Sequence, residues 1–156
     1  MVDRIDDRVY SGIDEGKRGS QMLGELLGEE LGQITTTRVL PAEGGRGPRV
    51  EVSFQSNGTL LGQHSMDMGT YTAEMRPDGS MIGVGQGVTR TERGETATWR
   101  GQGVGHFTSS GRQSWRGSIL YEANSEGLAR LNGVACVFED EVDESGKMEV
   151  KAWEWK

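Results

Sequence analysis

Hydrophobic residues near the start of the chain recur at the spacing of one helix face. Between Ser20 and Gly32, leucines and a methionine fall largely on one side of such a helix and glutamates on the other. Gly24 and Gly28 each weaken a helix interior by about 1 kcal/mol, so this segment must pack its leucines against something. We therefore predict a short amphipathic helix over residues 20–31, capped by Ser20. Residues before it show no sustained period and form an N-terminal arm, 1–19.

After Gly32 the hydrophobic period becomes two, which is the period of a β-strand with one buried face. The candidate strands are 33–40, 49–56, 58–64, 68–76, 80–91, 95–108, 113–122, 129–139 and 147–155. Glycine-rich turn signals separate them, such as Asn57-Gly58, Asp78-Gly79, Arg93-Gly94 and Ser145-Gly146. Such pairs tolerate the positive φ angles of tight hairpins.

Short connections of this kind place strands that are neighbours in sequence side by side in space. An open sheet of so many strands would leave exposed edges. We therefore predict an all-β fold, a closed up-and-down antiparallel barrel of about eight strands. A chain of 156 residues suits one such domain, spanning 20–156 with the N-terminal helix included.

Two adjoining strands carry glycine at every second position. These glycine ladders are Gly83, Gly85 and Gly87 in the first strand, and Gly101, Gly103 and Gly105 in the second. Glycine weakens a strand, so the alternation implies a geometrical use. A two-residue loop at Arg93-Gly94, the register we favour, sets the first ladder opposite Arg100, Gln102 and Val104. A three-residue loop would instead set glycine against glycine.

The ladders have two interpretations at this stage. In the first, glycine permits sharp coiling of the barrel, and Arg100, Gln102 and His106 face water. In the second, the glycines line the interior and leave room for a ligand that the same three polar side chains orient. Glycine at alternate strand positions with no following helix does not form a phosphate-binding loop.

Composition and charge exclude several function classes. The net charge of −7 opposes nucleic-acid binding, and no stretch approaches the roughly 20 apolar residues that cross a bilayer. A single cysteine, Cys136, allows no internal disulfide, which fits a reducing, cytoplasmic location. The two histidines, His64 and His106, lack the spacing of a metal site. We therefore expect no nucleic-acid or membrane partner, no metal and no cofactor.

Several side chains are candidates for binding or catalysis. Four aromatic residues alternate consistently with an inward face and would form the walls of an apolar pocket: Tyr71, Trp99, Trp115 and Tyr121. His106 is a candidate acid or base near neutral pH. Glu74 should face outward by its spacing from Tyr71, but the opposite parity would make it an interior general base.

Segments 79–85, 115–118 and 128–134, together with the aromatic final strand at 152–155, carry a pattern of glycines and turns. In this pattern the chain resembles the allene oxide cyclase barrel-like group of small calycin-like proteins. The resemblance implies an eight-stranded, often oligomeric barrel with a hydrophobic lumen, in which some relatives cyclise or isomerise lipophilic substrates. The catalytic carboxylate of the cyclases matches no single position of this sequence.

Three hypotheses follow for the function. The first is a barrel that binds a small lipophilic molecule in its lumen, and the second is a cofactor-independent cyclase or isomerase that uses His106 or Glu74. The third is a non-catalytic oligomerisation module, which would use Leu23, Leu26 and Leu27 or the apolar side of the ladders; a homo-oligomer is expected. A lumen of about 300 Å³ or more, reached by Arg100 or His106, would favour the first two.

Overall fold

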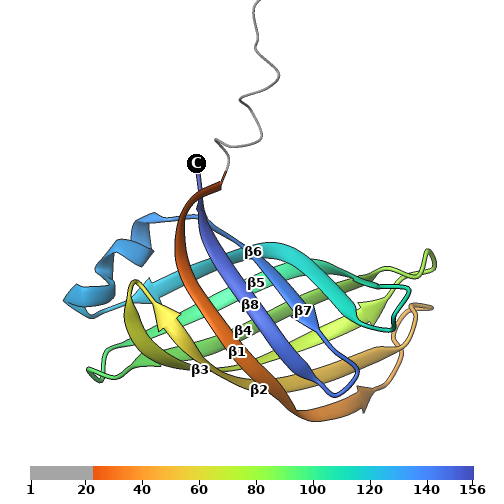
Figure 1. The fold of residues 1–156 in the computed structure, drawn as a ribbon. Coiled ribbons are helices and arrows are strands. Elements are labelled where there is room, and N and C mark those ends of the chain that lie inside the picture. The colour runs from red at the N-terminus through yellow and green to blue at the C-terminus, as the bar shows by residue number, and fades with distance from the viewer. Residues whose placement is uncertain (1–22) are drawn as a thin grey trace, which may run out of the picture.

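The computed structural model describes residues 23–156, which form a closed antiparallel barrel of eight strands (Figure 1). Each strand pairs with the next along the chain, and the last pairs with the first. The strands are β1 (Leu23–Leu40), β2 (Arg49–Leu60), β3 (Gln63–Met75), β4 (Met81–Thr91), β5 (Thr96–Phe107), β6 (Gln113–Ala123), β7 (Cys136–Val142) and β8 (Lys147–Trp155). The predicted fold class is confirmed. The predicted arm, 1–19, lies outside the described residues.

The predicted N-terminal helix is wrong, because the described part of it, from Leu23 on, belongs to β1. This strand closes the barrel by pairing with both β2 and β8. Its register against β8 shifts on either side of Leu26, so Leu26 is 43% exposed whereas Leu27 is 2% exposed. The helix-like spacing of the leucines therefore reflects an irregularity in a strand.

One predicted turn is also wrong. Gly58 lies inside β2, and the chain turns instead at Leu61 and Gly62, which have φ angles of 49° and 75°. A Cβ at Gly58 would overlap the backbone of β1, so this glycine permits a close approach of two strands. The turns predicted at Gly79, Gly94 and Gly146 are confirmed by their positive φ angles.

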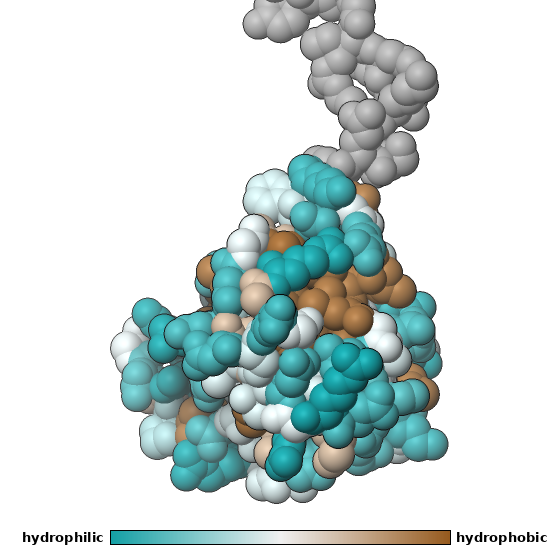
Figure 2. Space-filling view, turned by 90° about the vertical axis from the view of Figure 1, so that its left-hand side faces the viewer, coloured by the Kyte–Doolittle hydropathy of each residue, from teal (hydrophilic) through white to brown (hydrophobic). Residues whose placement is uncertain are grey.

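A 3-10 helix, η2 (Glu126–Gly133), closes one end of the barrel and replaces the first half of the predicted strand 129–139. Leu128 and Leu131 are fully buried there, against Leu60, Ala97 and Ala123. Asn132 fixes the helix to β6, because its side-chain amide exchanges two hydrogen bonds, of 2.7 and 2.8 Å, with the backbone of Ala123. Figure 2 faces this end, where polar side chains dominate and hydrophobic ones gather in one area.

The loop between β4 and β5 has three residues, not two. Thr91 donates its backbone N–H to the Glu95 carbonyl at 2.9 Å, and Gly94, at φ 80°, donates to the Thr91 carbonyl at 2.9 Å. Glycine in this conformation is typical of three-residue hairpin loops. The favoured register is therefore wrong by one position, and glycine faces glycine: Gly83 pairs with Gly103, and Gly85 with Gly101.

The orientation of the ladders combines parts of both interpretations. The glycines face the barrel interior, as in the second, with Gly83 and Gly85 buried between exposed neighbours. Arg100, Gln102 and His106 are exposed on the outer face, as in the first. Any ligand in the lumen is therefore out of reach of these three side chains.

Candidate functional site

The glycine ladders hold aromatic rings against the barrel wall. A Cβ at Gly87 would overlap the Trp99 indole, and one at Gly105 would lie 2.6 Å from the Trp115 indole. Gly103 meets Phe138 in the same way, at 3.1 Å. An eight-stranded barrel is only just wide enough for side chains to fill it, so bare backbone gives bulky rings the room they need.

A row of aromatic rings runs through the lumen. Trp99 and Phe54 stack with their centroids 6.2 Å apart and an interplanar angle of 26°. Phe54 and Tyr71 are 6.4 Å apart, and Tyr71 meets Trp115 edge-on at 5.8 Å. The structure places all four predicted wall residues, Tyr71, Trp99, Trp115 and Tyr121, around one cavity.

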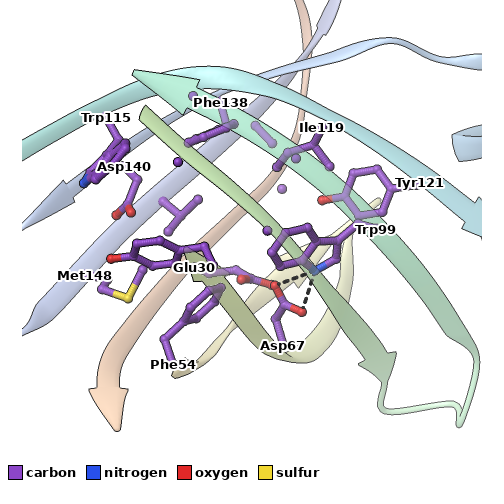
Figure 3. Close-up of a pocket in the computed structure, with 18 of the residues that line it drawn as sticks. Glu30, Phe54, Asp67, Trp99, Trp115, Ile119, Tyr121, Phe138, Asp140 and Met148 are labelled. Carbon is purple, nitrogen blue, oxygen red and sulfur yellow. Dashed lines mark hydrogen bonds between the residues drawn. The ribbon is translucent and has the colours of Figure 1, made fainter. Parts of the chain in front are cut away.

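This cavity lies in the middle of the barrel and has a volume of about 100 Å³ (Figure 3). Its walls include Phe54, Phe138 and the four predicted aromatic residues, with backbone from both ladders. The volume is below the roughly 300 Å³ expected of a lumen that binds or converts a ligand. Because one water molecule needs only about 10–15 Å³ of such space, the cavity still holds several water-sized groups. The lumen therefore has room for a small molecule and excludes a large lipid.

Three carboxyl groups line the cavity, and sequence analysis missed all of them as site residues: Glu30, Asp67 and Asp140. Asp67 is 8% exposed and accepts hydrogen bonds from Trp99 Nε1 at 2.9 and 3.1 Å and from Thr89 Oγ1 at 3.2 Å. Burial raises the pKa of Asp67 to about 6, although these hydrogen bonds oppose the rise. Asp67 is thus a well-partnered acid.

Glu30 extends from β1 toward Asp67, and Figure 3 shows the two carboxyl groups beside one another. Ser56 donates its hydroxyl to Glu30 Oε2 at 2.6 Å. Burial, and secondarily the charge of Asp67, raise the pKa of Glu30 to about 7. Two acids this close titrate as a pair, so they hold less than two full negative charges near neutral pH.

Asp140 is the exception among the three acids, because its Oδ1 is buried with no hydrogen-bond partner. The residue is 8% exposed and lies opposite Trp115 in the β6–β7 ladder. Burial raises the pKa of Asp140 to about 7; the charge of Glu141 adds to the rise and that of Arg116 opposes it. Figure 3 shows the Asp140 carboxyl directed into the cavity, apart from Asp67 and Glu30.

Two phenols complete the polar lining. Burial raises the pKa of Tyr71 and of Tyr121 above the usual range, with further contributions from Asp140 at Tyr71 and from Asp67 and Glu30 at Tyr121. Both therefore remain neutral hydrogen-bond donors. Among the described residues that line the cavity there is no lysine, arginine or histidine. The lumen is consequently aromatic and acidic.

Neither catalytic candidate reaches this cavity. His106 is exposed on β5, and Glu74 on β3 points outward, as its parity predicted, with ion pairs of 3.5 Å to Arg46 and 3.8 Å to Arg49. Gln102 contributes to the cavity wall, but its side chain is exposed. An interior general base at position 74 is therefore not what the fold provides.

Simple parity would have found one missed acid. Asp67 lies four positions before Tyr71, so both face inward from β3. The strand predicted at 68–76 began one residue too late to include it. Asp140 belongs to the acidic run 139–144, and such a run is typical of a solvated strand edge. Glu30 falls on the polar side of the expected helix.

Two further features of residues 23–156 bear on the expected partners. No group of three or more His, Cys, Asp or Glu side chains in this part of the chain is arranged to hold a metal ion. Over the same residues, no helix has the length and apolar character needed to cross a bilayer.

Comparisons with known proteins give information on the fold and none on the function. No protein-family model and no curated protein matches the sequence. Similar solved structures include a protein of unknown function from Clostridium acetobutylicum, with 12% identity and a TM-score of 0.74 over 85% of this chain and 97% of that chain. A conserved protein of unknown function from Rhodopseudomonas palustris has 11% identity and a TM-score of 0.72 over 85% and 96% of the two chains. A beta-barrel like protein from Acinetobacter baumannii has 12% identity, with the same TM-score and coverage. At these identities the likeness establishes the barrel fold alone.

Proposed function

We propose that this protein binds a small molecule in the lumen of its barrel. The observation that carries the proposal is the cavity of about 100 Å³, into which Asp140 directs an unpartnered, buried carboxyl oxygen. Leaving such a group unpaired costs about 1–3 kcal/mol, and more for a charged one. A ligand that donates a hydrogen bond to Asp140 offsets this cost, while the aromatic rings contact its apolar part.

The sequence predicts a lipophilic ligand, and we keep this expectation for the main part of the ligand but not for its polar end. The aromatic walls favour an apolar surface, but three acids require at least one polar end. The resemblance to the allene oxide cyclase barrel-like group supports the lumen as the place of binding.

A cyclase or isomerase is the second candidate, and one observation favours it. Asp140 lines the cavity, and its pKa of about 7 suits a general acid or base at neutral pH. The volume limits any such substrate to a small molecule. Binding is the simpler proposal, because it requires only the cavity and the unpartnered Asp140 oxygen.

An oligomerisation module is the third candidate, and it concerns the opposite surface. Three apolar side chains on the outer face of β4 and β6 are exposed: Ile82 at 40%, Val84 at 59% and Leu120 at 62%. Native mass spectrometry of the wild-type chain and of Val84→Lys tests a homo-oligomer through this face. A wild-type oligomer that Val84→Lys converts to a monomer supports the interface. A wild-type monomer, or an oligomer that Val84→Lys leaves intact, rejects it.

The four tryptophans offer a direct test of lumenal binding. Trp99 and Trp115 line the cavity, whereas Trp153 and Trp155 belong to β8 outside it. Under xenon, which enters small apolar cavities, we expect the indole N–H signals of the first pair to shift in a nitrogen-15 NMR spectrum. Equal shifts of all four signals, or none, would reject a lumenal site. Native mass spectrometry of the same sample detects any ligand that co-purifies.

A further inference from the structure

The three acids of the lumen differ in how well the protein satisfies them. Asp67 accepts hydrogen bonds from Trp99 and Thr89, and Glu30 accepts one from Ser56. Asp140 has no such partner for Oδ1 among the described residues. Asp140 is therefore the carboxyl group best able to accept a hydrogen bond from a ligand. It lies on the side of the cavity formed by β6 and β7.

We propose that the lumen takes a small organic cation, a primary ammonium ion, with its nitrogen at Asp140 and its alkyl body against the aromatic rings. This inference rests on the proposed function, since it names the ligand class for the same cavity. The charge of the cavity, the arrangement of its aromatic rings and its volume support this ligand class.

The charge of the cavity favours a cation. Three carboxyl groups line it, and no basic side chain among the described lining residues compensates them. A buried carboxylate is costly unless it is paired, so a bound ammonium group stabilises the ionised form. A bound anion would meet repulsion, and a neutral alcohol would leave the charge uncompensated.

The rings beside Asp140 suit the same ligand. Trp115 lies next to Asp140 across the β6–β7 ladder, and Tyr71 meets Trp115 edge-on at 5.8 Å. Tyr71 and Asp140 line the same cavity, and the charge of Asp140 contributes to the raised pKa of Tyr71. The faces of tryptophan and tyrosine rings attract cations, and more strongly when water is excluded. An ammonium group at Asp140 thus lies beside a carboxylate and between aromatic rings that line the same cavity.

The volume limits the size of the ligand. A cavity of about 100 Å³ holds several water-sized groups, at about 10–15 Å³ each, and so accommodates a short alkyl chain with one polar end. Propylammonium, with one nitrogen and three carbons, is the natural probe. 1-Propanol has the same number of non-hydrogen atoms without the charge, and propionate, which is one atom larger, carries the opposite charge.

The experiment titrates the nitrogen-15-labelled protein with each of these three probes at about pH 8, where the lumenal acids are ionised. The indole signals of Trp99 and Trp115 report binding, and those of Trp153 and Trp155 serve as internal controls. We expect propylammonium to bind about tenfold or more tightly than 1-propanol, and propionate not to bind. Sodium chloride holds the ionic strength constant throughout.

Two matched variants locate the charge that matters. Asp140→Asn removes the lumenal carboxylate, and Glu139→Gln removes the neighbouring charge, which faces outward toward Arg116 at 3.4 Å. We expect Asp140→Asn to weaken propylammonium binding about tenfold and to spare 1-propanol, whereas Glu139→Gln changes either by less than about twofold.

The outcomes separate this inference from the function on which it rests. If 1-propanol binds the lumen as well as propylammonium, or Asp140→Asn leaves the preference unchanged, the cation is rejected and a lumenal site remains. If propionate binds best, the cation is likewise rejected. If none of the probes shifts the signals of Trp99 and Trp115, and xenon does not either, the lumenal site itself is rejected.

Discussion

Two walls of the same lumen differ in what they present to the interior: one presents bare backbone and the other presents carboxyl groups. The glycine wall, formed by β4 and β5, brings almost bare backbone to the interior, and rings such as Trp99 and Trp115 lie against it. The acidic wall, formed by β1, β3 and β7, brings Glu30, Asp67 and Asp140. The glycine wall sets how much room the lumen has, and the acidic wall sets what chemistry fits into that room.

The largest expected effect is on stability at the glycine wall. A Cβ at Gly87 would overlap the Trp99 indole and would lie 2.6 Å from the Met68 carbonyl oxygen. Gly87→Ala should therefore lower the free energy of unfolding by about 2–4 kcal/mol, measured by urea denaturation. At Gly101 the nearest atom is 3.2 Å away, so Gly101→Ala serves as the control and should cost less than about 1 kcal/mol. Equal costs would show that the rings do not depend on the ladder.

The next effect concerns pH and belongs to the acidic wall. Burial raises the pKa of Asp67 to about 6 and the pKa of Glu30 and Asp140 to about 7. These groups bind protons more tightly in the folded chain, so their contribution is complete below about pH 4 and is lost as pH rises to about 7. We expect the free energy of unfolding to be about 1–3 kcal/mol lower at pH 8 than at pH 5.

Other charged and titratable groups near Asp140 and on the surface also bear on how stability depends on pH. Tyr71 faces it from β3 and stays neutral, while Arg116 and Glu141 act from the outer surface. Surface acids with a lowered pKa, such as Asp78 and Asp143, lose their contribution only below about pH 4. A stability that rises between pH 5 and pH 8 would contradict the buried, unpaired acids.

A smaller effect compares two acids of the acidic wall. At pH 8, Asp140→Asn should raise the free energy of unfolding by about 1 kcal/mol, because it removes a buried charge that has no partner. Asp67→Asn should lower it by about 1 kcal/mol, because an amide accepts fewer of the hydrogen bonds from Trp99 and Thr89. Thermal denaturation of both variants measures the difference. Destabilisation by Asp140→Asn would mean that its carboxyl has a partner inside the protein.

The smallest effect is expected outside the barrel. Arg100→Ala and His106→Ala remove exposed side chains on the outer face of β5. Both should leave the free energy of unfolding within about 0.5 kcal/mol and lumenal binding within about twofold. Loss of binding in either variant would place the ligand on the outer surface instead.

The barrel was predictable because its signals are local. Alternation and turn glycines lie within a few residues of one another, and positions such as Gly79 and Gly146 have the positive φ angles they indicated. The helix prediction failed at Leu26 and Leu27, where a register shift in β1 imitates helical spacing. The predicted register of the ladders is wrong because the loop that contains Gly94 is one residue longer than expected. One extra loop residue shifts the pairing of β4 with β5 by one position.

The chemistry of the lumen was harder to predict, because it depends on closure of the barrel. The aromatic walls followed from alternation, so Tyr71, Trp99, Trp115 and Tyr121 were found. An acid in a polar stretch, such as Asp140, is normally solvated. It becomes buried only because β7 pairs with both β6 and β8 in a closed sheet. The local sign of its inward orientation is its alternation with Phe138 and Val142 in β7.

The most direct test of the account is a crystal structure of the protein soaked in propylammonium chloride. The account predicts density for the probe in the lumen, with its nitrogen within about 3 Å of Asp140 Oδ1 and its chain against Trp115 and Tyr71. A lumen filled by side chains, or a probe found only on the outer surface, would contradict it.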